Sequence, residues 1–147
     1  GGAAMMQAAR EAIHCDDGPL LIGVTVLTSM GDATLDAVGV RHSPMDQVSR
    51  LARLAAEAGL DGVVCSPMEL ADLRGQRGFD FKLVAPCIRA LGAARGDQKR
   101  IATPAEAITA GADYLVVGRP LTSSNHPEEV LAMINAECAT AADTRDH

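Results

Sequence analysis

Two arginines of this chain come directly after short apolar runs, and their positions are the ones that most clearly suggest chemistry. Arg89 follows one run, and Arg119, preceded by Gly118, follows the last. Guanidinium groups bind phosphate or carboxylate oxygens through paired N–H donors, and a glycine lets backbone N–H groups come close to an anion. Gly118-Arg119 alone is more typical of a turn glycine beside a surface arginine, whereas two arginines at matching positions favour one shared phosphate. The pattern alone is compatible with both interpretations.

The segment between these arginines has a composition suited to a lid. Residues 91–99 have the sequence LGAARGDQK, rich in Gly and Ala and long enough to close over a ligand. Gln98 in this segment is, on its own pattern, an ordinary solvated amide. Lysine occurs only as Lys82 and Lys99, and neither is flanked by carboxylates in the way of a tuned proton donor. The residues alone therefore predict phosphate binding and no particular reaction.

Composition and charge argue against several other classes of function. The cysteines lie tens of residues apart without a CxxC pair, and the histidines form neither HxH nor HExxH, so we expect no metal site. A net charge of −6, a pI near 5.1 and the absence of Trp argue against nucleic-acid binding. No apolar run approaches the roughly 20 residues of a membrane span, and no targeting segment is recognisable. We expect a cytoplasmic protein whose cysteines are small apolar core residues.

The candidate residues follow four short apolar runs that are bounded by polar or turn residues. The runs span residues 20–27 (LLIGVTVL), 62–65 (GVVC), 81–88 (FKLVAPCI) and 114–117 (YLVV). Continuous Val, Ile and Leu runs of this length are typical of strands buried on both faces in a parallel sheet. Ligands of such sheets bind where the strands end, so Thr28, directly after the first run, joins the two arginines as a candidate.

Helix signals separate the apolar runs. Ser43 is a candidate N-cap with Pro44 at the first helical position, and Gly59 is the stop of the helix that they begin. Residues 103–111 (TPAEAITAG) repeat this pattern and start with a capping box. A third helix is predicted after Pro127, with Val130, Leu131, Ile134 and Cys138 on one face. We expect residues 138–147 to be a flexible tail.

The order of these elements predicts an α/β fold with four parallel strands and flanking helices. Residues 58–65 and 110–117 repeat a helix–turn–strand pattern, which is typical of a chain built from βα units. Both an open doubly wound sheet and half of a (β/α)8 barrel fit, since a complete barrel takes about 250 residues. Asp61 and Asp113 precede strands at the opposite end of the sheet, and they are more typical of turn or capping residues than of catalytic acids.

The strand ends and the sequence around them resemble the bacterial orotidine 5'-phosphate decarboxylases. Matching segments lie at 20–30, 59–70, 81–89, 96–122 and 126–137. The most specific of them contains DQKR, then TP, then AGADYLVVGRP. The resemblance covers residues 1–137 in the family's order and corresponds to the C-terminal half of the family's (β/α)8 TIM barrel. We therefore expect one half-barrel domain, with the front half of the barrel outside the sequence given.

The resemblance implies an activity and a role for each candidate residue. The family removes carbon dioxide from orotidine 5'-monophosphate to give UMP, in de novo pyrimidine synthesis, without a metal or an organic cofactor. It also implies a homodimer with active sites at the interface. Thr28 would then meet the pyrimidine, and Gln98 would bridge the base and the phosphate. Arg89, Gly118 and Arg119 would hold the phosphate.

Two departures from the family pattern bear on function. The family usually has Pro-Gly-Ile-Arg-Pro where residues 86–90 are Pro-Cys-Ile-Arg-Ala. Cys87 would strain or crowd the site if the glycine has a positive φ or leaves room for the ligand, and would be a mild change otherwise. The family's D-x-K-x-x-D array, whose lysine protonates the carbanion at C6, has no counterpart in this sequence. We therefore assign no catalytic residue.

Two functions of different kinds fit these observations. The first is the decarboxylase, with the sequence given as a fragment whose partner is the missing N-terminal half. The second is a catalytically inactive half-barrel that binds nucleotide phosphates, alone or as a self-associated pair. A relative that acts on another sugar phosphate is a third alternative, which the Thr-Ser-Met and Asp-Gln-Lys-Arg segments disfavour.

Overall fold

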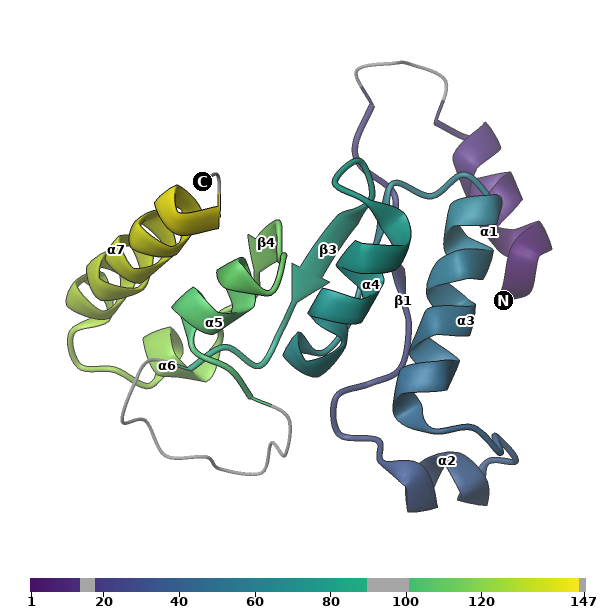
Figure 1. Cartoon of the computed structure of the whole chain (residues 1–147), viewed down its shortest axis with the longest axis horizontal. Helices are drawn as coiled ribbons and strands as arrows, with labels where there is room; N and C mark the ends of the chain where they lie inside the picture. The colour runs from purple at the N-terminus through teal and green to yellow at the C-terminus, as the bar shows by residue number, and fades with distance from the viewer. Residues whose placement is uncertain (14–17, 90–100, 146–147) are drawn as a thin grey trace.

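A computed structural model describes residues 1–13, 18–89 and 101–145 of the chain. Within these ranges four strands form one parallel sheet in the order β1-β2-β3-β4 (Figure 1). The strands are β1 (Ile22–Val24), β2 (Gly62–Val64), β3 (Lys82–Ala85) and β4 (Tyr114–Leu115). The helices are α1 (Gly2–Glu11), α2 (Asp32–Ala37), α3 (Pro44–Glu57), α4 (Leu70–Arg77), α5 (Pro104–Thr109), α6 (Arg119–Thr122) and α7 (Pro127–Arg145), with a 3-10 turn η1 (Pro67–Glu69).

The predicted α/β class is confirmed, and each predicted apolar run contains one strand. All three strand pairs are parallel, and the strands are in sequence order, so each consecutive pair is joined by a crossover that contains helix. The strands are shorter than the runs, most clearly in the first, where three of the residues 20–27 form β1. An apolar run indicates only that its residues are buried, whereas a strand also requires hydrogen bonds to a neighbouring strand. The runs therefore extend beyond the sheet.

The two faces of the sheet have different surroundings. Val63, Leu83 and Ala85 are completely buried, on the side where α3 packs against β2 and α4 against β3. A cross-strand row on the other face runs from Val24 to Tyr114, and these two ends of the row are 65% and 51% exposed. Helices outside and an apolar inner face are the arrangement of part of a (β/α)8 barrel, in which the second face lines the interior.

Two helix starts follow the predicted capping pattern. The Ser43 hydroxyl accepts a hydrogen bond from the Asp46 N–H at the start of α3. At the start of α5, Thr103 and Glu106 form the reciprocal capping box, and the Thr103 N–H holds the pKa of Glu106 below its ordinary value. Both helices end just before the glycine that was predicted to stop them, Gly59 after α3 and Gly111 after α5, and both glycines have a positive φ. These signals are local in sequence, which explains why they could be recognised without the fold.

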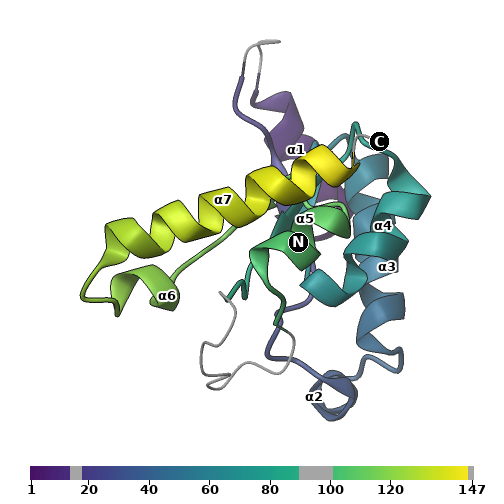
Figure 2. The ribbon, with the colours of Figure 1, turned by 60° about the vertical axis from the view of Figure 1, so that its left-hand side comes forward.

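The C-terminal helix corrects one expectation. Residues 138–147 were expected to fray, but α7 continues to Arg145 and packs along α5 (Figures 1 and 2). Ala141 is buried, and Ile134, two turns earlier, is buried as well, whereas Leu131 is exposed. The predicted apolar face therefore packs in part: Val130 and Cys138 are half-buried beside the buried Ile134, and Ala141 extends the same face. None of the helices in the described ranges has the length and apolar character needed to cross a membrane.

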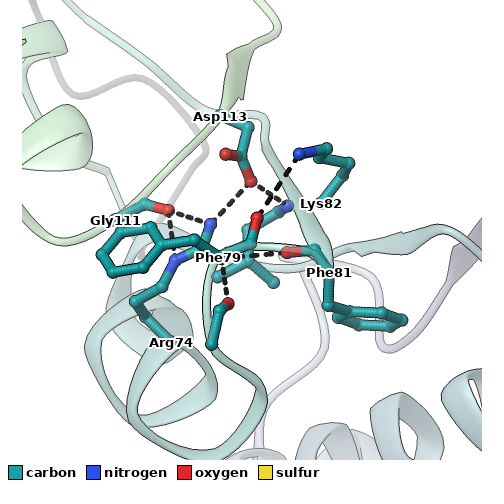
Figure 3. A network of polar contacts seen from close by, with 8 residues as sticks. Arg74, Phe79, Phe81, Lys82, Gly111 and Asp113 are labelled. Carbon is teal, nitrogen blue, oxygen red and sulfur yellow. Dashed lines mark hydrogen bonds and ion pairs between the residues drawn. The ribbon is translucent and has the colours of Figure 1, made fainter.

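The N-terminal end of the sheet is held by an arginine and an aspartate between β3 and β4. Arg74 of α4 donates to the Gly111 carbonyl at 2.6 Å and to the Asp113 carboxylate at 2.6 Å, as Figure 3 shows. Asp113 also accepts the Leu83 N–H of β3 at 2.7 Å. We call Arg74, Gly111, Asp113 and Leu83 the β3–β4 clamp. The Arg74 side chain is only 9% exposed, and it donates further to the Phe81 carbonyl.

A second contact of the same design joins β1 to β2. Arg10 of α1 donates to the Gly59 carbonyl at 2.7 Å and to the Asp61 carboxylate, and Asp61 accepts the Leu21 N–H at 2.6 Å. We call Arg10, Gly59, Asp61 and Leu21 the β1–β2 clamp. Its arginine and aspartate are 32% and 31% exposed. The repeated Ala-Gly-x-Asp sequence therefore marks a repeated arginine-binding turn, in which Asp61 and Asp113, predicted as turn or capping residues, each accept an arginine and a backbone N–H.

Candidate functional site

The predicted phosphate-binding residues lie together at the C-terminal end of the sheet. Arg89 follows β3, and Gly118 and Arg119 follow β4, and all three line one cavity of about 240 Å³. Its other described lining residues are Pro86, Cys87, Ile88, Val116 and Pro120. We call this space the arginine cavity. The roles of these residues in ligand binding stay a prediction, but the convergence on which that prediction depends is present in the fold.

Backbone contacts fix the position of each wall of the arginine cavity. Ile88 pairs with Ala102 in a parallel bridge, and the Arg89 N–H donates to the Ala102 carbonyl at 3.0 Å. On the opposite wall the Gly118 carbonyl accepts the N–H groups of Leu121 and Thr122, so the chain turns sharply after β4. A Cβ placed on Gly118 would meet no heavy atom within 4 Å, so the backbone there is open to approach.

Arg89, one of the residues lining this cavity, carries an unsatisfied donor. Its Nε atom is buried and has no hydrogen-bond partner within residues 1–13, 18–89 and 101–145. A buried donor without a partner is unfavourable, because it has lost water without gaining an acceptor. An anion in the cavity would supply that acceptor and would pair with the guanidinium charge. The arrangement thus favours an anionic ligand.

Thr28 reaches the arginine cavity indirectly, through Cys87. Thr28 lies in the loop after β1 and is not among the residues lining the cavity, but its Oγ1 accepts a hydrogen bond from the Cys87 Sγ at 3.0 Å. Cys87 has a φ of +66°, so its backbone is left-handed. This is the position at which the family that the sequence resembles usually has glycine. The sequence flagged Cys87 as a departure, but no local pattern predicted its contact with Thr28. Gln98, Lys99 and the predicted lid at 91–99 lie outside the described residues.

The described lining of the arginine cavity holds two arginines and the Cys87 thiol as its ionisable side chains. None of the described lining residues is a carboxylate, a histidine or a lysine. No group of three or more His, Cys, Asp or Glu side chains that could hold a metal ion occurs in the part of the chain that the structure describes. Burial raises the pKa of the Cys65 thiol to about 12, so Cys65 stays neutral and acts as a small apolar core residue.

Comparison with known proteins gives consistent matches over most of the chain. Residues 1–134 match the family described as "Orotidine 5'-phosphate decarboxylase / HUMPS family". The chain is 55% identical over 141 residues to the orotidine 5'-phosphate decarboxylase of Actinobacillus succinogenes and 56% identical over 138 residues to that of Pasteurella multocida. The crystal structure of the orotidine 5'-phosphate decarboxylase from Lactobacillus acidophilus superposes with a TM-score of 0.77 at 33% identity.

These matches cover nearly all of this chain but only part of each relative. The alignments include 95% and 92% of this chain, and 61% and 59% of the Actinobacillus and Pasteurella proteins. The Lactobacillus structure is covered over 59% of its chain, and 93% of this chain takes part. The chain therefore spans about three fifths of the length of the curated relatives that it matches.

Proposed function

The chain belongs to the orotidine 5'-phosphate decarboxylase / HUMPS family, and from this premise we propose that it is the phosphate- and base-binding part of an orotidine 5'-phosphate decarboxylase. The whole protein would convert orotidine 5'-monophosphate to UMP and carbon dioxide in pyrimidine synthesis. The observation that carries the proposal is the arginine cavity, in which Arg89, Gly118 and Arg119 converge. A nucleotide 5'-phosphate is the ligand that this charge and its position at the strand ends fit.

Each site residue has one role in this proposal. Arg89 and Arg119 bind the phosphate oxygens, and Gly118 lets the backbone come close to them. Thr28, one contact away through Cys87, meets the pyrimidine, and Gln98 bridges base and phosphate. Binding energy gained at the remote phosphate holds the ring in position for the reaction at the base. In the cytoplasm the protein would act as a homodimer.

The reaction itself requires residues that this sequence does not provide. No D-x-K-x-x-D pattern occurs among the 147 residues, and the described cavity lining holds no proton donor of that kind. This observation favours a second candidate function for the chain by itself, which is binding of nucleotide phosphates without catalysis. Supplying the N-terminal half of a relative would distinguish the two, because only the decarboxylase would then gain turnover.

Calorimetric titration of the 147-residue chain with UMP tests the proposal, together with an assay of carbon dioxide release from orotidine 5'-monophosphate. We expect binding of UMP without release. Arg119→Ala should weaken UMP binding by about 2 to 5 kcal/mol, since it removes a charge partner of the phosphate. Arg53→Ala is the matched control, because Arg53 is a surface arginine paired with Glu57.

Absence of UMP binding by the unchanged chain, or an unchanged affinity in Arg119→Ala, contradicts the proposed phosphate site. Release of carbon dioxide at an enzyme-like rate would contradict the assignment of catalysis to the part of the relatives that this chain does not cover. A lysine of this chain, such as Lys99, would then have to supply the proton.

A further inference from the structure

Cys87 combines an unfavourable backbone with a specific side-chain contact. Within the described ranges it is the one residue other than glycine with a positive φ. A left-handed conformation is disfavoured for residues with a Cβ and is retained when the surrounding structure requires it. The side chain is nearly fully buried, so the conformation is not that of a loose surface turn.

The turn at Cys87 joins two loops that are distant in sequence. The Cys87 thiol donates to Thr28 Oγ1 at 3.0 Å across 59 positions of sequence. Cys87 follows β3 and Thr28 follows β1, and β2 lies between these strands in the sheet. The contact therefore crosses the C-terminal end of β2 and ties the first loop to the third.

The same turn also places the arginine cavity. Pro86, Cys87, Ile88 and Arg89 are consecutive lining residues. The Ile88–Ala102 bridge and the Arg89 hydrogen bond to Ala102 fix the chain immediately after Cys87. One residue thus has its backbone in the wall of the predicted phosphate site and its thiol on the residue predicted to face the base.

We propose that Cys87 is a positioning residue, which orients the Thr28 hydroxyl toward the pyrimidine and couples that hydroxyl to the arginine cavity. The inference rests on the proposed function and adds a residue to it. A hydroxyl oxygen that accepts the thiol proton is restricted in the direction of its own O–H. Glycine at this position would allow the same backbone without strain, but it would remove the contact with Thr28.

Binding of UMP and of inorganic phosphate to the 147-residue chain separates the two halves of the site. Phosphate has no base, so its affinity depends on the arginine cavity alone. Cys87→Gly is the main variant because glycine adopts a positive φ readily and should fold. We expect it to lower UMP affinity on the order of fivefold, the effect of one modest hydrogen bond, with phosphate affinity unchanged. Cys87→Ser, which keeps a donor, should return UMP affinity to within about twofold of the original chain.

A double-mutant cycle identifies Thr28 as the residue through which Cys87 acts. Once Thr28→Val has removed the hydroxyl, adding Cys87→Gly should have no further effect on UMP affinity. Cys138→Ser is the matched control, since it changes a cysteine of α7 outside the cavity.

The outcomes distinguish failure of this inference from failure of the proposed function. If the unchanged chain binds UMP and Cys87→Gly binds it equally well, the positioning role is wrong while the proposed function stands. Equal losses of affinity for UMP and for phosphate would place the effect of Cys87→Gly in the arginine cavity. That result would also overturn the coupling to Thr28. If the unchanged chain does not bind UMP, the proposed function fails, and this inference fails with it.

Discussion

At the N-terminal end of the sheet, Arg10 and Arg74 each donate to a glycine carbonyl and to an aspartate that also accepts a backbone N–H within or directly before a neighbouring strand. At the C-terminal end, Arg89 lies in a cavity whose described lining contains no carboxylate, and its buried Nε has no described partner. The same side chain is structural where the fold supplies an acceptor, and it is available to a ligand where the fold does not. The described acceptors therefore distinguish Arg10 and Arg74, which hold the sheet together, from Arg89, for which we propose a ligand as the partner.

The two clamps at the N-terminal end differ from one another in burial. Arg74 and Asp113 are 9% and 17% exposed, whereas Arg10 and Asp61 are 32% and 31% exposed. Water screens the second pair more strongly and can replace a lost partner there. The same set of contacts should thus contribute unequally to stability.

The largest expected effect is on stability, from Arg74→Ala. The substitution removes the Arg74 donor from the Asp113 carboxylate, which keeps only the Leu83 N–H, and from the Gly111 and Phe81 carbonyls, in a mostly buried place. We expect a loss of about 3 to 5 kcal/mol in the free energy of unfolding, measured by urea denaturation. Arg53→Ala, at an exposed pair, should change it by less than about 0.5 kcal/mol. A loss below 1 kcal/mol for Arg74→Ala would mean that the clamp is not structural.

The next effect is on binding, from Arg89→Ala. Removing this guanidinium should weaken UMP binding by about 2 to 5 kcal/mol, measured by calorimetry. The free energy of unfolding should stay the same or rise, because a buried donor without a partner is removed. If Arg89→Ala unfolds as readily as Arg74→Ala, the contrast between the two ends of the sheet is wrong.

Arg10→Ala should have a smaller effect on stability. Its pair with Asp61 is about one third exposed, so we expect a loss of about 1 kcal/mol or less. Urea denaturation of Arg10→Ala and Arg74→Ala under the same conditions compares the two losses in the free energy of unfolding. Losses of equal size in the two variants would show that burial does not set the strength of the clamps.

The smallest effect concerns acid pH. The Leu21 N–H, followed by the Arg10 guanidinium, holds the pKa of Asp61 below its ordinary value of 3.8. The unfolded chain therefore binds this proton more readily, so the contribution of Asp61 is complete above the unfolded pKa and is lost as the pH falls below it. Asp61→Asn should flatten the decline of stability below about pH 4, measured by thermal unfolding at successive pH values. An equal decline of stability in the original chain and in Asp61→Asn would contradict this role of Asp61.

The parts of the fold that the sequence predicted are those with local signals. The capping residues Ser43 and Thr103 bond to N–H groups three positions away, so their role is evident within one turn of helix. The burial of Ala141 in α7 had no such local signal, because α7 packs along α5 only in the folded chain. The predicted tail was wrong for the same reason, since tertiary packing orders a segment with weak apolar spacing.

The candidate site was predictable at the strand ends and not beyond them. Arg89, Gly118 and Arg119 follow apolar runs directly, and parallel strands bring such positions to one edge. The contact between Cys87 and Thr28 depends on a left-handed backbone and on which strands are neighbours. Neither quantity has a signature in the residues nearby.

The sequence by itself determined the βα order, the helix starts and the arginines at the strand ends, because each depends on residues close together in the chain. Only the tertiary structure decided which arginines have protein partners. The Ala-Gly-x-Asp turns accept Arg10 and Arg74 because α1 and α4 pack beside them, while no such carboxylate lies among the described residues around Arg89. A guanidinium has the same charge in every setting, so its function depends on the acceptors that folding brings within hydrogen-bond distance.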